Sequence, residues 1–436
     1  MASAINLAPS VTGTPGSRIP TELAGRLREL LERRRVGYSL EAPFYTDREI
    51  YLAEMQEIFA NHWLFAASLA EIPQPGDYVT VDFGPLSLIL VRDDDGGVNA
   101  LHNVCRHRGA RIMRDGSGTI GNLVCGYHSW TYAPDGSLLH ASGTSAGFDK
   151  ECFGLKRAHV RIVTGHVFVC LAETPPDDFD ELAEDAESYF APYELEHTRI
   201  AYQQDIIEDG NWKLVMENNR ECYHCDGHPE LQCALFPTQG LAGKPEDLPE
   251  HYREAWDRER EAERTMIERR NRYGYRHGVI EGKLDTRVTG YRIDCTALDG
   301  EGESFSPTGH RLSKKLLGEV PEFKLGRTGM HVQPNFWSHF LGDHAITFAV
   351  FPIHETQTLV RTIWHVAEDA VEGVDYDLDA LTNTWKNTNI QDRAFVELCQ
   401  RGVASPAYEP GPYMQSEWMV EAFVNWYVQR MRNYLS

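Results

Sequence analysis

Two cysteine–histidine pairs in the first third of the chain have the residue types and spacing of a metal centre. One residue separates Cys105 from His107, and two residues separate Cys125 from His128. Two thiolates and two imidazoles suit either a four-coordinate zinc site or a Rieske [2Fe–2S] cluster, in which the cysteines bind one iron and the histidines the other. Common zinc motifs supply two cysteines or two histidines from one loop, whereas each loop here supplies one of each. The spacing therefore favours the Rieske cluster, because each loop can bind both irons.

The histidines would also set the electronic properties of such a cluster. Neutral imidazoles in place of thiolates reduce its negative charge and raise its reduction potential above that of an all-cysteine cluster. Glycines at positions 109, 121 and 126 permit tight turns and let backbone N–H groups approach the sulfides. We therefore predict a centre that accepts electrons from a ferredoxin-like or flavin donor and passes them on.

A second candidate site lies in the segment 211–230. His224 and His228 are four residues apart, which would place both rings on one face of a helix. With one carboxylate they could form a two-histidine, one-carboxylate iron site that leaves positions open for O₂ and substrate. Asp392, on a late predicted helix, is the candidate carboxylate. Glu221 lies one turn before His224 on the same side of the predicted helix.

The residues of this second segment also permit other interpretations. Cys222 and Cys225 could bind zinc together with the histidines, or could form a redox-active C-x-x-C pair. A single aspartate on a charged helix is normally solvated. The upstream motif favours the iron site, because an electron-delivering cluster needs an acceptor in the same protein.

The elements that must position these residues change in character along the chain. Residues 21–35 and 47–62 are predicted helices, and Asp47 is the expected cap of the second. Residues 63–171 contain short β-rich runs broken by Pro-Gly, Asp-Gly and Gly-Gly turns, which indicates an all-β domain. The acidic, proline-containing segment 173–178 is a predicted linker.

Helical and strand patterns mix beyond this linker, so the expected fold class is α+β. The expected elements are a charged helix at 248–272, strands between 330 and 367, and helices near 377–401 and 415–433. We predict three parts, namely an N-terminal arm and helix that packs on the catalytic domain (1–45), the all-β Rieske domain (46–175) and a catalytic domain (176–436).

Composition argues against several classes of protein. A net charge of −23 over 436 residues disfavours nucleic acid as a partner, because phosphate binding requires a basic surface. The sequence contains no run of 18 apolar residues, so no membrane span is predicted. Residues 1–20 lack the pattern of a signal peptide. Nine cysteines, an odd number, do not indicate a disulfide framework. The expected compartment is the cytoplasm.

Taken together, the motifs resemble those of the catalytic α subunit of Rieske non-haem iron oxygenases over nearly the whole chain. The resemblance rests on the two cysteine–histidine pairs, the block Glu217–His224 and the late pair Gln391-Asp392. It implies a helix-grip-like α+β catalytic domain with a central antiparallel sheet. It also implies two cofactors, a Rieske cluster bound by the two pairs and Fe(II) bound by His224, His228 and Asp392.

The family also implies roles for neighbouring residues and partners. Its acidic residue three positions before the first histidine ligand connects the Rieske site of one subunit to the iron of the next, a role that falls on Glu221. Asn218 is a second candidate catalytic residue. A head-to-tail homotrimer and an NADH-dependent, ferredoxin–NADH type of reductase are the implied partners. The chain departs from the family in one respect, since three residues rather than four separate its two histidine ligands.

Residue 221 also bears on the substrate. Aromatic-ring dioxygenases of the family mostly carry aspartate there, and glutamate in this context is similar to the branch that acts on quaternary ammonium compounds. The string Glu-Asn-Asn-Arg-Glu-Cys-Tyr-His is most similar to that of glycine betaine demethylases. This resemblance implies monooxygenation of an N-methyl group, with dimethylglycine and formaldehyde as products.

A trimethylammonium group needs an aromatic cage, because it cannot donate hydrogen bonds and is held by ring faces. The candidate cage residues are Tyr223, Phe336, Trp337 and Phe340. Other substrates compatible with the motifs are an aromatic ring, stachydrine, carnitine or choline. A different class, a zinc-stabilised binding protein that uses both Cys/His clusters, is the alternative to an oxygenase.

Overall fold

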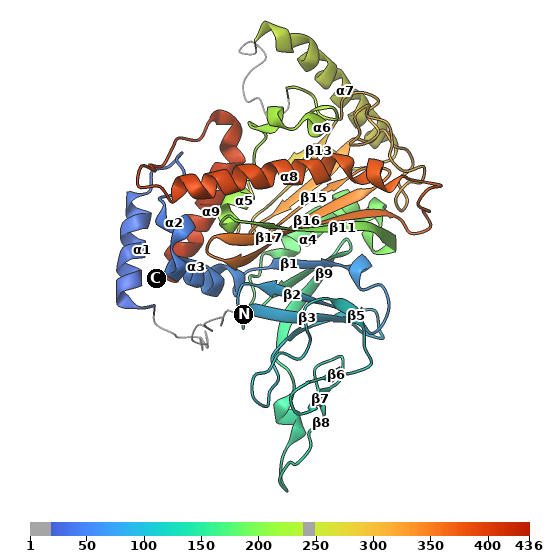
Figure 1. Cartoon of the computed structure of the whole chain (residues 1–436). Helices are drawn as coiled ribbons and strands as arrows, with labels where there is room; N and C mark the ends of the chain where they lie inside the picture. Colours follow the sequence, from blue (N-terminus) through green and yellow to red (C-terminus); the bar gives the residue numbers. More distant parts are fainter. Residues whose placement is uncertain (1–18, 239–248) are drawn as a thin grey trace, which may run out of the picture.

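The computed structural model describes residues 19–238 and 249–436 (Figure 1). The predicted N-terminal arm, apart from its last residues, lies outside these ranges. The described chain contains two seven-stranded antiparallel sheets and one small three-stranded sheet. No helix of the described ranges is long and apolar enough to span a membrane.

The first large sheet has the strand order β1-β10-β9-β4-β3-β2-β5. Its strands are β1 (Leu64–Ser68), β2 (Asp77–Phe83), β3 (Leu86–Arg92), β4 (Val98–His102), β5 (Ser117–Thr119), β9 (Arg157–Val163) and β10 (His166–Cys170). The β2–β3 hairpin turns at Gly84, where φ is +56° and the N–H donates to Pro352 O of the second large sheet at 2.7 Å. A side chain at this glycine would overlap Tyr51, and its positive φ also favours glycine.

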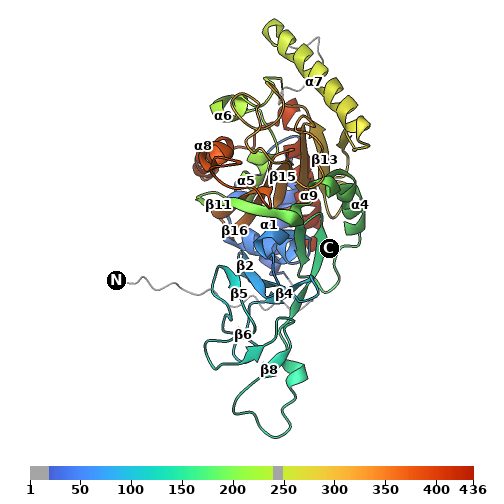
Figure 2. The same ribbon diagram turned by 90° about the vertical axis from the view of Figure 1, so that its right-hand side faces the viewer.

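The small sheet extends from this domain as a separate tip. It consists of β6 (Leu123–Val124), β7 (Thr131–Tyr132) and β8 (Leu138–His140). Figures 1 and 2 show it at the lower end of the molecule, opposite α6 and α7. A hydrophobic cluster separate from the main core joins the tip to β3 and β4 of the first large sheet, and it includes Trp130, Tyr132 and Leu101. This cluster can therefore hold the loops of the tip in place without support from the catalytic side.

The second large sheet has the order β11-β17-β16-β15-β14-β13-β12. Its strands are β11 (Thr198–Glu208), β12 (Val279–Ile280), β13 (Tyr291–Thr296), β14 (Arg327–Val332), β15 (Phe336–Phe340), β16 (Ala345–His354) and β17 (Gln357–Ala367). Strand β15 and nearly all of β16 are buried, as expected for the middle of a sheet that is covered on both faces.

The helices surround this second sheet. They are α1 (Thr21–Arg33), α2 (Pro43–Thr46), α3 (Arg48–Glu54), α4 (Phe179–Phe190), α5 (Trp212–Asn219), α6 (Pro229–Gln232), α7 (Arg253–Arg272), α8 (Leu378–Val403) and α9 (Trp418–Tyr434). Helix α8 lies along the sheet in Figure 1, close to α5 and β11. Asp47 caps α3 as predicted, and the predicted helix of residues 47–62 continues beyond α3 as a π-helical turn, Met55–Phe59.

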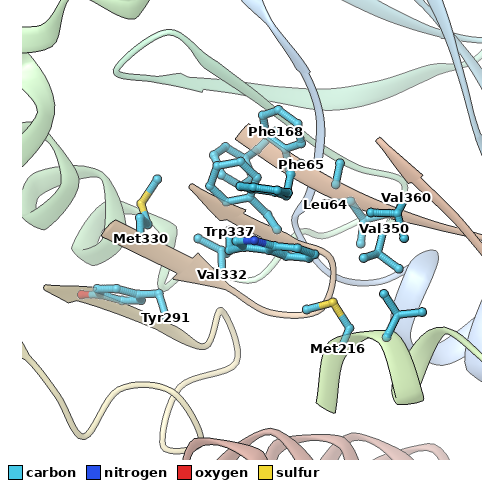
Figure 3. Packing of buried hydrophobic residues seen from close by; sticks show 14 of the residues in the cluster. Leu64, Phe65, Phe168, Met216, Tyr291, Met330, Val332, Trp337, Val350 and Val360 are labelled. Carbon is cyan, nitrogen blue, oxygen red and sulfur yellow. The ribbon is translucent and has the colours of Figure 1, made fainter. Parts of the chain in front are cut away.

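Aromatic packing joins the two large sheets. The rings of Phe65 and Phe336 lie 4.3 Å apart, and Phe65 also packs against Phe168 (Figure 3). The Asn335 side chain forms two hydrogen bonds, of 3.0 and 2.9 Å, with the backbone of Phe65. The interface is therefore a continuous part of the hydrophobic core, and the two sheets together support the sites described below.

A buried ion pair fixes α5, the helix that leads into the second candidate site. Lys213 Nζ and Glu54 Oε1 are 2.6 Å apart, and neither side chain is exposed. Trp212 and Tyr427 also donate to the Glu54 carboxylate, at 2.8 and 2.6 Å. These bonds connect α3, α5 and α9 and satisfy the buried charges, as a stable buried pair requires.

Candidate active site

His224, His228 and Asp392 are brought together in the structure. Asp392 Oδ1 lies 3.2 Å from His224 Nε2 and 3.0 Å from His228 Nε2. The three candidate ligand atoms all lie within 4.8 Å of one another, close enough for one metal ion. Two imidazoles and one carboxylate form the donor set of a non-haem iron site that keeps open positions.

The prediction that one regular helix carries both histidines is wrong. Helix α5 ends at Asn219, and the two histidines flank a 3₁₀ turn, Cys225–Gly227. Proline at position 229 disfavours α-helical backbone at His228, whose φ and ψ are −115° and 83°. A disulfide between Cys222 and Cys225 closes the same loop. The shorter histidine spacing therefore occurs in an irregular segment that still directs both rings to one point.

Neighbouring side chains orient both imidazoles. The Glu221 carboxylate accepts the Nδ1–H of His224, and Gln391 Oε1 lies 2.8 Å from His228 Nδ1. Glu230 accepts the amide N–H of Gln391 at 3.1 Å, which directs the amide oxygen toward His228. Each Nδ1 therefore carries the proton, and each Nε2 presents its lone pair to the space beside Asp392, as expected for metal-binding histidines.

The protonation of these ligands supports the same assignment. Within the described chain, His228 Nε2 is buried and has no hydrogen bond of acceptable geometry. Burial alone would lower the pKa of His224, but its hydrogen bonds with Asp392 and Glu221 outweigh burial and raise the pKa to about 9. Without metal, the site would hold a proton at neutral pH, and a metal cation would displace it. The donor set thus fits Fe(II).

The four predicted Rieske ligands also converge, at the tip of the molecule. The thiols of Cys105 and Cys125 are buried, with 3% and 2% exposure, whereas His107 is exposed and His128 is partly exposed. The two histidine Nδ1 atoms lie 3.1 Å apart. Tyr132 Oη lies 3.3 Å from Cys105 Sγ. Two inner thiols and two outer imidazoles match a cluster with one cysteine-bound and one histidine-bound iron.

The two candidate metal sites lie in different parts of the molecule. The loops that carry the cysteines and histidines belong to the tip around β6–β8, and His224, His228 and Asp392 lie between α6 and α8 (Figure 1). The two large sheets separate them. Electron transfer within one chain would therefore have to cross the protein core.

A cavity of about 330 Å³ opens beside the second site. It contains the predicted ligands together with Asn218, whose Nδ2 lies 3.4 Å from His224 Nε2. The wall of the cavity also contains three arginines, two further histidines and three aromatic residues. These are Arg220, Arg292, Arg327, His331, His339, Phe305, Trp385 and Trp418. The cavity therefore offers cationic and aromatic groups within one small volume.

The aromatic residues of this wall differ from those predicted. Phe336 and Phe340 are fully buried on the opposite face of β15, where Phe336 packs on Phe65 and Phe340 packs on Phe190. Side chains alternate along a strand, so both residues point away from the cavity while His339 points toward it. The prediction that Phe336 and Phe340 line the substrate pocket is therefore wrong.

The other two predicted cage residues also lie outside the cavity wall. Tyr223 is 61% exposed. Trp337 stacks on Phe348, with ring centroids 4.9 Å apart, and borders a separate small void beside Asp392. Trp385, which does line the cavity, precedes Asp392 by seven residues on α8, two helical turns away on the same face. This spacing could have identified Trp385 from the sequence.

Two family models match most of the chain. The Rieske [2Fe-2S] domain matches residues 62–156, and the ring hydroxylating alpha subunit (catalytic domain) matches residues 179–433. The chain belongs to the family of Rieske non-haem iron oxygenase α subunits. It is therefore an oxidoreductase with a Rieske cluster domain and a catalytic non-haem iron domain, and the predicted α+β class is confirmed.

Several characterised relatives match nearly the full length. The glycine betaine monooxygenase oxygenase subunit of Pseudomonas aeruginosa is 41% identical over 98% of this chain and 96% of its own. The protein of that name from Chromohalobacter salexigens is 40% identical over 92% of this chain and 88% of its own. A crystal structure of the quaternary ammonium Rieske monooxygenase CntA has a TM-score of 0.67 at 21% identity, over 92% of this chain and 98% of that chain, and shows the shared fold.

Proposed function

We propose that this oxygenase removes an N-methyl group from a quaternary ammonium carboxylate and that glycine betaine is its substrate. One O₂, two electrons and two protons would convert glycine betaine into dimethylglycine, formaldehyde and water. The observation that carries the proposal is the combination of arginines and aromatic rings in one cavity beside His224, His228 and Asp392. Such a wall suits a zwitterion with a carboxylate at one end and a trimethylammonium group at the other. The full-length similarity to glycine betaine monooxygenases supports this choice.

In this proposal His224, His228 and Asp392 hold Fe(II), and the two cysteine–histidine pairs hold the cluster. Bound iron would supply the O₂ activation needed to oxidise a methyl C–H bond. Glu221 and Gln391 hold the imidazoles in the required tautomer, and Asn218 offers an amide N–H beside His224. The buried position of the site limits access of water to the reacting groups. The hydroxymethyl amine formed from the substrate would then break down to formaldehyde without further catalysis.

Trp385 and Phe305 are the proposed contacts for the trimethylammonium group. Their ring centroids lie 5.6 Å apart with nearly perpendicular planes, and both rings border the cavity. Trp385 stands on the same helix as Asp392, so a cation on its ring face would have its methyl groups near the metal site. These two residues replace the predicted cage of Phe336 and Phe340.

We also propose a head-to-tail homotrimer in which Glu221 connects the cluster of one subunit to the iron of the next. The separation of the two sites within one chain supports this arrangement, as do the exposed His107 and the partly exposed His128 at the tip. Arg106 and Arg108 beside them are exposed as well, on a chain with a net charge of −23, so the tip can approach an acidic surface of a neighbour. Each active centre would then contain groups from two subunits.

Complementation between two inactive variants tests the trimer. His107→Ala would remove the cluster, and Asp392→Ala would remove the mononuclear iron. If electrons cross between subunits, trimers assembled from a refolded or co-expressed mixture regain activity because some neighbouring pairs have both centres intact. A mixture that assembles but stays inactive would contradict electron transfer between subunits.

The proposed reaction also requires a source of electrons. The electrons would come from NADH through a separate reductase, in the cytoplasm.

We propose domain boundaries close to residues 45 and 175. The positions of α2 and α4 support them, because β1 to β10 all lie between these two helices. Helix α1 packs on α3 and α9, in agreement with an N-terminal segment that belongs to the catalytic side.

A substrate panel tests the proposed reaction. The purified chain with a surrogate reductase and NADH is expected to release formaldehyde from glycine betaine, and more slowly or not at all from choline, carnitine and stachydrine. Reduced protein is expected to give the rhombic EPR signal of a Rieske cluster. Oxidation of benzoate-like acids without formaldehyde release from any quaternary amine would refute the proposed function and favour an aromatic ring as substrate.

A further inference from the structure

Arg220 is a fully buried arginine in the wall of the active-site cavity. Its Nη1 donates to Asn219 Oδ1 at 2.7 Å and to His331 Nδ1 at 2.9 Å, and its Nη2 donates to Gln333 Oε1 at 3.1 Å. All three partners are neutral, and Nε has no hydrogen-bond partner in the described chain. No ion pair of Arg220 is found among the residues that the structure describes.

The other two arginines of the cavity differ in this respect. Arg327 forms an ion pair with Asp294, and Arg292 Nη1 lies 3.2 Å from the same carboxylate. Arg327 also donates to Thr296 and to His339, both at 3.0 Å, so each of its three nitrogens has a partner. Asp294 thus balances part of their charge, whereas Arg220 has no such partner within residues 19–238 and 249–436.

A second buried arginine outside the cavity shows what a purely structural role looks like. Arg270, with 1% exposure, donates to the backbone oxygens of Arg276 and Leu325 at 2.6 and 3.0 Å. These bonds close the loops around α7. Among the described residues, Arg220 forms no bond to backbone oxygen and connects only side chains, which a neutral residue could do at lower desolvation cost.

Burial lowers the pKa of Arg220 to about 9, so its guanidinium still carries a charge at neutral pH. A buried cation without a counter-ion is unfavourable, and an anion that enters the cavity would remove this penalty. In the described chain the buried Nε–H has no hydrogen-bond partner, and Nη2 forms one bond, to Gln333. A carboxylate that reached this edge could accept from both nitrogens, since guanidinium groups bind carboxylates through two such donors at once.

We infer that Arg220 binds the carboxylate of the substrate and thereby determines which end of the molecule reaches the metal site. The inference rests on the proposed function, because it assigns a residue to the carboxylate of a betaine. Repulsion from the guanidinium and attraction to the ring faces would direct the trimethylammonium group toward Trp385 and Asp392. Arg220 is then a specificity determinant rather than part of the scaffold.

His331 supplies a second donor for the same carboxylate. A guanidinium only donates, so the Nδ1 of His331 must accept the bond from Arg220 and its Nε2 must carry the proton. His331 lines the cavity, and burial together with the arginines around it holds its pKa well below the ordinary value. The neutral ring therefore stays an N–H donor across the physiological pH range.

The test compares Arg220→Met and Arg220→Lys with Arg270→Met in the holoenzyme. For Arg220→Met we expect the KM for glycine betaine to rise about 10- to 100-fold, the range for loss of a charge-assisted hydrogen bond pair. Inhibition by tetramethylammonium, which has no carboxylate, should change by less than about threefold, since only the anion contact is lost. Arg220→Lys should lie between Met and the native residue, because lysine retains the charge without the two-donor geometry.

Thermal stability separates the two possible roles of Arg220. Removal of an uncompensated buried charge should leave the melting temperature of ligand-free Arg220→Met equal to or above that of the native protein. Arg270→Met should melt lower and retain its KM for glycine betaine. An unchanged KM in Arg220→Met, equal weakening of tetramethylammonium, or a lower melting temperature with both ligands weakened would overturn the inference.

Failure of the proposed function would be seen separately. If the native protein releases no formaldehyde from glycine betaine, the proposed reaction is wrong whatever Arg220 does. The anion site is then measured directly with acetate, which should raise the melting temperature of native protein and not of Arg220→Met. Equal shifts in both proteins would overturn the inference by itself.

Discussion

The tip around β6–β8 and the site between α6 and α8 bind metals in opposite ways. At the tip, all four ligands come from two loops within 24 residues, and the histidines are exposed (His107) or partly exposed (His128). At the second site, 168 residues separate His224 from Asp392, and the ligands are wholly or partly buried beside a cavity. A local site can be identified from spacing, whereas a site assembled from distant elements depends on the core that holds them. The exposure of the tip suits the proposed electron exchange with a partner, and the cavity at the second site suits the proposed binding of a substrate.

Loss of the Asp392 carboxylate should have the largest effect, because it should remove the metal from one site and leave the other intact. Asp392→Ala removes the carboxylate shared by His224 and His228, so we expect mononuclear iron to be lost and formaldehyde release to fall about 1,000-fold or more, since a catalytic metal contributes several kcal/mol. Metal analysis should find the cluster iron alone, and the Rieske EPR signal should persist. Loss of that signal in the same variant would show that the two sites are not independent.

The buried ion pair beneath the catalytic site gives the next largest effect. Glu54→Ala leaves the Lys213 ammonium buried without a partner, so we expect the free energy of unfolding to fall by about 3–5 kcal/mol. Chemical denaturation monitored by tryptophan fluorescence measures this change. The double variant Glu54→Met with Lys213→Met should recover most of the loss, and failure to recover would mean that the pair acts mainly through Trp212 and Tyr427.

Loss of the hydrogen bond that orients His228 should weaken iron binding less than loss of a ligand does. Gln391→Ala removes the acceptor of the His228 Nδ1–H, and we expect iron to bind about 10- to 100-fold more weakly. Competition with a chelator measures this affinity. Tyr132→Phe, which removes the hydroxyl beside Cys105 at the tip, is the matched control and should leave the affinity of the mononuclear site unchanged. An equal effect of both variants would contradict the independence of the two sites.

The last effect depends on pH and concerns the interface between the sheets. Burial lowers the pKa of His166 to about 4, below its ordinary value near 6.5, so the folded protein keeps this ring neutral while the unfolded chain binds a proton. Its contribution to stability is complete above about pH 6.5 and is lost as the pH falls toward 4, by up to ~3 kcal/mol. His166→Asn should flatten the fall in melting temperature between pH 6.5 and 4. An unchanged slope would assign the acid sensitivity to other groups.

The sequence predicts the long helices better than the irregular segment that carries the two histidine ligands. Periodicity located α1, α7, α8 and α9 closely, because each is long and has strong side-chain patterning. The prediction of a helix over 221–228 is wrong, because its backbone is set by Pro229 and by packing of both histidines against Phe395 of α8 rather than by local propensity.

The substrate pocket was predicted less well than the ligands. The aromatic run at 336–340 was assigned to the pocket, but strand alternation and the first large sheet place Phe336 and Phe340 in the core. The sequence cannot show that Arg220 lacks a carboxylate partner among the described residues, because this depends on which carboxylates lie near it after folding. Trp385 could have been found from its two-turn spacing to Asp392.

A single-turnover experiment without reductase tests the central claim most directly. Protein with a reduced Rieske cluster and Fe(II) holds the two electrons that one monooxygenation requires. On exposure to O₂ and glycine betaine, it should oxidise its cluster and release formaldehyde and dimethylglycine in equal amounts, up to one of each per mononuclear iron. Oxidation of the cluster with no formaldehyde, under conditions where glycine betaine is bound, would contradict the account.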